Sequence, residues 1–172
     1  MDTRQNARDI QEALAAPFGN SEIKCKPGVV SGNRALVLWY VDARTILDRL
    51  DAVMGIGNWR DDYEFLPDGS VICRLSLRID GEWITKVDVG GASEQADSGD
   101  RHKAAVSDGL KRAAVHFGIG RHLYRLLTLW ADFDQAKKRF SQTPQLPVSC
   151  KGVAPAVPGI SQLVGSQRTR VT

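Results

Sequence analysis

The residues best suited to chemistry in this chain lie between Arg101 and Arg125. The segment reads RHKAAVSDGLKRAAVHFGIGRHLYR and holds six lysines or arginines and all three histidines, opposed by one acid, Asp108. The formal net charge of +3 comes from three basic residues beyond position 150, so the rest of the chain is neutral overall. A protein that is neutral overall but concentrates its positive side chains in one short segment attracts polyanions. We therefore expect this segment to bind an extended anion, with nucleic acid as the first candidate.

A long amphipathic helix is the element predicted to carry most of these cations. Its buried stripe is expected at helical spacing, on Val106, Leu110, Ala113 and Phe117. Two rows flank this stripe, with Lys103, Ser107 and Lys111 on one side and Asp108, Arg112 and His116 on the other. Gly109 costs about 1 kcal/mol relative to alanine in a helix interior, which predicts a close contact with another backbone.

An antiparallel β-meander is predicted before this helix, which makes the fold class α+β. Its strands are expected at Trp59–Leu66, Val71–Ile79 and Glu82–Val89, the last two joined by an Asp80-Gly81 hairpin turn. The middle strand alternates, with Arg74, Ser76 and Arg78 on its solvent face, and Lys86 is expected near Arg74 or Arg78. The other predictions are a helix at Asp9–Leu14, strands at Ile23–Pro27 and Ala35–Val41 with Gly28–Arg34 as their loop, and a helix from an Asp42 cap to Met54.

Composition and cysteine content limit the class of protein. The length of 172 residues suits one domain, expected at residues 1–140. Residues 141–172 are rich in proline, serine and glycine and are expected to be disordered or extended. No membrane-spanning run or signal peptide is found, and the three cysteines are isolated, which predicts a reduced, cytoplasmic protein, associated with the nucleoid if it is bacterial.

The sequence offers little support for an enzyme. It has no phosphate-binding Gly-x-x-x-x-Gly-Lys-Ser/Thr loop, so no nucleotide or other cofactor is expected. The histidines lack metal-ligand spacing, so no metal is expected either. Asp97 and Asp100 suit the cap of a helix, and Asp108 can pair with Arg112. Among the aromatic residues, Trp83 and Tyr124 are the candidates for exposed base-stacking side chains.

Several of these residues resemble the core signature of the Rad fifty-two/twenty-two type repair and recombination family. The shared pattern is Asp88-Val89-Gly90, a polar linker, the run KAAVSDGLKRA from Lys103 to Ala113, and then His116-Phe117-Gly118. Ala43–Gly55 followed by Asn58-Trp59 resembles that family's helix and glycine–tryptophan turn. The closing FGIGRHLY is similar to the bacterial branch found in radiation-resistant bacteria. The resemblance covers about residues 9–135.

This resemblance implies a ring of subunits that holds single-stranded DNA in a positive groove. Lys111 and Arg112 fall on positions that hold the DNA backbone in that family, and Lys103 falls on another basic position of the same helix. Arg44 lies at or one residue from a basic position on the preceding helix. The chain departs from the family at Val115, where the eukaryotic proteins have a third arginine, and at Gly91, where an aromatic residue often follows Asp-Val-Gly.

The resulting prediction is a DNA-repair protein that binds single-stranded DNA and protects its ends. Whether it also anneals complementary strands without ATP stays open, as does the identity of any protein partner. A metal-dependent nuclease and a structural oligomer that binds an acidic protein are the alternatives from other classes. The expected DNA-binding residues are Lys111, Arg112, Lys103, Arg44, Arg121, Arg125, His116, Arg74, Arg78 and Lys86.

Overall fold

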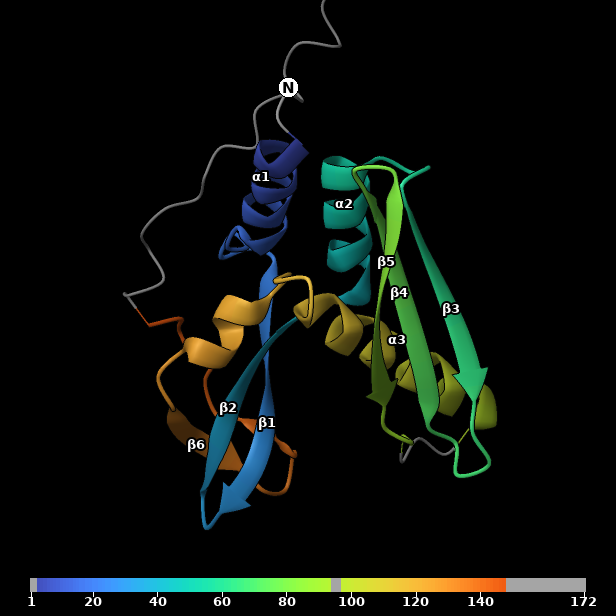
Figure 1. Cartoon of the computed structure of the whole chain (residues 1–172). Coiled ribbons are helices and arrows are strands. Elements are labelled where there is room, and N and C mark those ends of the chain that lie inside the picture. Colours follow the sequence, from blue (N-terminus) through green and yellow to red (C-terminus); the bar gives the residue numbers. More distant parts are fainter. Residues whose placement is uncertain (1–2, 94–96, 148–172) are drawn as a thin grey trace, which may run out of the picture.

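The computed structural model describes residues 3–93 and 97–147, which form two antiparallel sheets and three α-helices (Figure 1). In chain order the elements are α1 (Thr3–Ala15), β1 (Ile23–Ser31), β2 (Arg34–Val41), α2 (Ala43–Met54), β3 (Trp59–Phe65), β4 (Val71–Ile79), β5 (Glu82–Gly90), α3 (Ser98–Val115), the 3-10 helix η1 (Arg121–Arg125), β6 (Trp130–Asp134) and β7 (Arg139–Phe140). The α+β class is therefore confirmed.

The predicted meander is the sheet β3-β4-β5. Its strands differ from the predicted ones by one residue at most, because strong alternation and turn residues fix both ends. Asp80 and Gly81 have positive φ angles of 52° and 89°, as a tight hairpin of matching twist requires. Helices α2 and α3 lie along one face of this sheet, and no helix of the described residues covers the other face (Figure 1).

The second sheet, with strand order β1-β2-β6-β7, is only half predicted. The expected loop over Gly28–Arg34 is wrong, because β1 continues to Ser31 and only Gly32 and Asn33 turn the chain. A register shift between Pro27 and Val30 absorbs the residues that looked like a loop. Strands β6 and β7 were not predicted, and the N-terminal helix begins earlier than expected, at Thr3.

One hydrophobic core joins the helices to the meander. Its buried members are Leu14, Phe18, Val41, Ile46, Leu50, Met54, Cys73, Leu75, Leu77, Leu110, Ala113, Ala114 and Ile119. The helix α3 buries Ala105 and Ala114 where the sequence predicted Val106 and Phe117, which are only partly buried. The predicted stripe is therefore rotated slightly around the helix.

The expected close contact at Gly109 is present, and it lies within the chain. A Cβ on Gly109 would lie 3.1 Å from the Cβ of Cys73 and 3.3 Å from the nitrogen of Gly90. A Cβ on Gly90 would collide with the carbonyl oxygen of Ala105 and the nitrogen of Gly109. These glycines let β5 and α3 touch backbone to backbone.

No helix in the described part of the chain is long and apolar enough to cross a membrane. The prediction for the tail falls mainly on residues 148–172, which lie outside the described residues.

Candidate nucleic-acid interface

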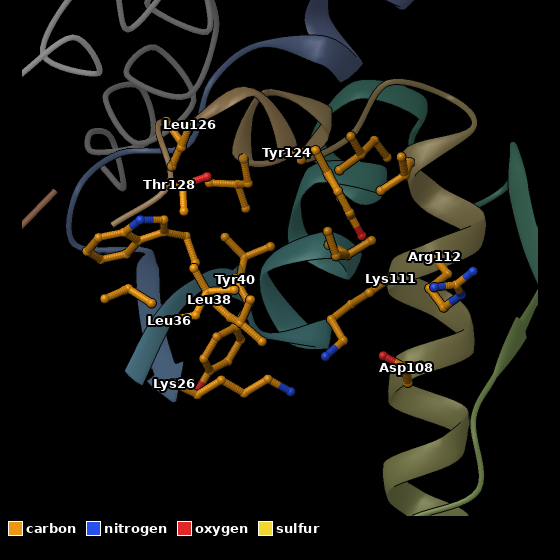
Figure 2. Close-up of a pocket in the computed structure, with 18 of the residues that line it drawn as sticks. Lys26, Leu36, Leu38, Tyr40, Asp108, Lys111, Arg112, Tyr124, Leu126 and Thr128 are labelled. Carbon is orange, nitrogen blue, oxygen red and sulfur yellow. The ribbon is translucent and has the colours of Figure 1, made fainter. Parts of the chain in front are cut away.

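A groove separates strand β2 from helix α3, and η1 with the segment after it closes one end (Figure 2). The hollow has a volume of about 370 Å³. Strand β2 supplies Leu36, Leu38 and Tyr40 to one wall, since alternate residues of a strand point to the same face. Lys111 and Arg112 of α3 line the opposite wall. The two predicted backbone-binding residues are therefore placed at a groove.

Two lysines from opposite walls extend into this groove toward each other (Figure 2). Lys26 of β1 and Lys111 each place Nζ 5.7 Å from the ring centroid of Tyr40. Neither lysine forms an ion pair within the described part of the chain. Burial lowers the pKa of Lys111, and the charge of Lys26 lowers it further, against an opposing effect from Asp108. The groove thus brings two lysines together without an ion pair, and Asp108 is the one acid among its described lining residues.

Arg112 lies at the rim of the groove, and a residue of the neighbouring strand β5 binds its side chain. Its Nε donates to Oδ1 of Asp88 at 3.0 Å, while Oδ2 of Asp88 lies 3.1 Å from Nε2 of His116. The predicted pairing of Arg112 with Asp108 is therefore wrong, because β5 brings a better-placed carboxylate. Asp108 instead accepts a hydrogen bond from the backbone nitrogen of Gly91 at 3.3 Å.

A second hollow of about 430 Å³ adjoins the groove at Lys111, which lines both. Arg44 of α2 and Lys111 both line this second hollow. Asp42 also lines it, but its carboxylate forms an ion pair with Lys24 and caps no backbone group with its side chain. The pairing with Asp42 raises the pKa of Lys24.

The other predicted site residues lie outside the groove. Arg121 donates to the carbonyl oxygens of Val115 and His116, at 2.7 to 3.1 Å, and so caps the end of α3. Lys103 is exposed and pairs with Asp100 at 3.2 Å, and Arg125 is exposed on η1.

The three cations predicted on the meander do not share one face. Arg74 and Arg78 point outward, away from α3, where Arg74 pairs with Glu64 and Asp62. The expected place of Lys86 is wrong, because the register sets Lys86 opposite Leu75. Directly opposite residues share a face, so Lys86 belongs to the helix-facing row of β5.

Two groove residues, Lys26 and Tyr40, were missed. Lys24 and Lys26 are two residues apart in a segment that was predicted as a strand, so the sequence could have predicted that they share a face. The place of Tyr40 in the groove wall could not be predicted, because it depends on how β2 packs against α3. Of the two aromatic candidates, Tyr124 is 72% exposed and lines the groove, while Trp83 is 38% exposed on the outer sheet face.

The described residues contain no group of three or more His, Cys, Asp or Glu side chains that could hold a metal ion. His122 is partly buried beside Phe18, whose backbone nitrogen donates to its Nε2 at 3.4 Å. Burial lowers the pKa of His122, with a smaller effect from the charge of Arg49. This histidine therefore packs η1 onto the core, away from the cationic groove.

Comparison with known proteins agrees with this geometry. The single-stranded DNA-binding protein DdrA of Deinococcus radiodurans is 38% identical over 158 residues, which cover 91% of this chain and 74% of the relative. The protein of the same name from Deinococcus deserti is 39% identical over 158 residues, covering 91% of this chain and 77% of the relative. Residues 6–140 match the model of the Rad52/22 family double-strand break repair protein. Because that match spans most of the chain, this protein belongs to the Rad52/22 family.

Proposed function

We propose that this chain binds single-stranded DNA in DNA repair, along the groove between β2 and α3. The observation that carries the proposal is that Lys26 and Lys111 approach each other across the hollow, near the ring of Tyr40, and that no acid of residues 3–93 or 97–147 forms an ion pair with either. Lysines neutralise phosphates, and an aromatic ring stacks on a base of any identity. The names of the two DdrA relatives support the same ligand.

The lining of the groove favours binding without sequence preference. Asn and Gln, which read base edges well, are absent from the described residues that line it. Recognition then depends on backbone charge and on how easily the strand bends into the groove. A duplex holds its phosphates too stiffly to follow such a groove, so single strands are the better ligand.

The activity that follows is protection of DNA ends by a binding protein, without catalysis. A strand held by its phosphates can leave its bases turned outward and available for pairing. Annealing of complementary strands would then need no ATP.

The sheet edges support assembly into a ring. Strands β3 and β5 are the two outer strands of their sheet, and in the part of the chain that the structure describes each has one edge without a neighbouring strand. Unpaired edges of this kind are covered in a closed oligomer. Gly109 gives no support for assembly, because Gly90 of the same chain already covers it.

The test is binding of a labelled oligonucleotide by the full chain and by the double variant Lys111→Ala, Arg112→Ala. Each lost phosphate contact lowers the salt slope by roughly 0.7, so two lost contacts lower it by about 1.4. The matched control is Arg74→Ala with Arg78→Ala, which removes the same charge from the outer sheet face. Equal losses in both double variants would contradict the groove, provided that circular dichroism shows both folded.

The same samples test the finer claims. A blunt duplex should compete poorly, complementary strands should anneal without ATP, and light scattering should show an oligomer. Failure to anneal would leave end protection standing, whereas a monomer at all concentrations would contradict the ring. Cleavage of the oligonucleotide on addition of magnesium would support a nuclease in place of a binding protein.

A further inference from the structure

Asp88 on β5 is not among the described residues that line the groove, but its carboxylate bonds Arg112, which does line it. Its Oδ1 accepts the Nε–H of Arg112 at 3.0 Å and the backbone N–H of Val89 at 2.7 Å. Its Oδ2 lies 3.1 Å from Nε2 of His116, one helical turn beyond Arg112. The carboxylate is mostly covered, with 21% of the side chain exposed, while Arg112 and His116 are about half exposed.

We propose that Asp88 is a positioning residue of the DNA-binding groove, which fixes Arg112 at the rim with its two terminal nitrogens available to a phosphate. The inference rests on the proposed function. The bond to Asp88 uses only Nε of Arg112, and no hydrogen bond from its Nη atoms is found in the described part of the chain. A guanidinium held at Nε keeps its two terminal nitrogens for a bidentate contact with phosphate oxygens.

The backbone around Asp88 is built to keep this geometry. Gly90 follows Asp88 by two residues on the same face of β5 and touches the backbone of α3 at Gly109. Arg112 lies three residues after Gly109, so the contact between the two glycines fixes the distance from Asp88 to Arg112. Hydrogen bonds from Arg112, His116 and Val89 lower the pKa of Asp88 against the opposing effect of burial. The carboxylate is therefore charged at neutral pH.

The two possible roles of Asp88, a purely electrostatic one and the positioning of Arg112, predict opposite effects of its removal on DNA binding. If this acid acts only through its charge, its loss strengthens DNA binding, because it removes repulsion of the phosphates. If it positions Arg112, its loss weakens binding, because the long arginine side chain must then be ordered by the DNA itself. Ordering one such side chain on binding corresponds to a roughly two- to tenfold loss of affinity.

The experiment compares Asp88→Ala with Asp108→Ala, each alone and in an Arg112→Ala background, by titration of a labelled single strand with the full chain. Asp108 is the matched control, because it is an acid on the groove lining that bonds no basic side chain of the groove. Asp88→Ala should weaken binding roughly two- to tenfold. Asp108→Ala should strengthen binding, because it removes repulsion of the phosphates. In the Arg112→Ala background, Asp88→Ala should cause no further loss.

The outcomes separate this inference from the proposed function. Stronger binding by Asp88→Ala, or an equal loss with and without Arg112, would overturn the positioning role. No loss of binding in Arg112→Ala alone would instead remove the groove contact on which the inference depends. If circular dichroism shows that Asp88→Ala is unfolded, Asp88→Asn takes its place, and the predicted direction of the change is the same.

Discussion

Two surfaces of this molecule hold their cations in opposite ways. On the outer face of the β3-β4-β5 sheet, Arg74 is partly exposed and pairs with Glu64, which raises the pKa of Arg74. In the groove, Lys26 and Lys111 each place Nζ near the ring of Tyr40, neither is in an ion pair with another described residue, and burial lowers the pKa of Lys111. The outer arginine is thus neutralised within the chain, whereas the groove lysines are not.

This difference indicates which cations serve the fold and which serve a ligand. A charge that is half buried and unpaired destabilises the folded protein, since water solvates it better than the groove does. Such a group is retained where something outside the chain compensates it, and perturbed pKa values gather at functional sites for that reason. A basic residue that is already paired has less to offer to a phosphate.

The largest difference between the two surfaces is expected for their aromatic residues. Tyr40→Ala should weaken single-stranded DNA binding by roughly 1–3 kcal/mol, the usual contribution of one stacked base. Trp83→Ala should leave binding unchanged, since Trp83 lies on the outer face, where the guanidinium of Arg60 covers it at 4.4 Å. Fluorescence anisotropy with one oligonucleotide measures both variants. Equal losses would show that DNA also contacts the outer face.

A smaller effect is expected for two lysines that share one face of β1. Lys26→Ala removes an unpaired cation, and the loss of one phosphate contact at 0.1 M salt corresponds to about a fivefold weaker affinity. Lys24→Ala is the matched control, because Lys24 already pairs with Asp42. We expect Lys24→Ala to change the affinity and its salt slope little. If the two variants lose affinity equally, pairing within the chain does not decide which cations bind DNA.

The fold was predictable where its signals are local. Alternation and the Asp80-Gly81 turn gave the meander almost to the residue, and a helical spacing gave α3. The addition of β6 and β7 to the pair β1-β2 was not predictable, because β6 has only five residues and pairs with Arg34–Leu36, nearly a hundred positions earlier. Short strands carry little periodicity, and their pairing is decided by packing over a long range of sequence.

The candidate site was predictable where its basic residues are close together in the sequence. Lys111 and Arg112 stood out in a basic window and in the family pattern, and both line the groove. The same basic segment also contains Arg121, whose guanidinium donates to carbonyl oxygens at the end of α3. Local sequence does not show this capping contact, and DNA binding by Arg121 stays a prediction. Nor could local sequence show that Asp88, on another strand, replaces Asp108 as the partner of Arg112.

The smallest expected effect concerns stability, and its sign differs between the two surfaces. Lys111→Met should raise the melting temperature at neutral pH, because methionine keeps the packing of the stem and removes a charge that is held in an unfavourable place. Arg74→Met should lower the melting temperature slightly, because it breaks the pairing with Glu64. Thermal unfolding without DNA measures both variants.

The pH dependence of the Lys111→Met gain follows from the direction of the pKa shift. The pKa of Lys111 lies below its ordinary value of 10.5 in the folded protein, so the unfolded chain binds this proton more tightly. Wild-type stability is therefore reduced in full at pH values below the lowered pKa. The reduction fades as the pH rises through the lowered pKa, and it disappears only above 10.5, where Lys111 is neutral in both states. The gain of the variant should shrink over the same range. A gain in melting temperature that is independent of pH would assign the effect to packing. A lower melting temperature of the variant at neutral pH would mean that the charge of Lys111 does not destabilise the fold.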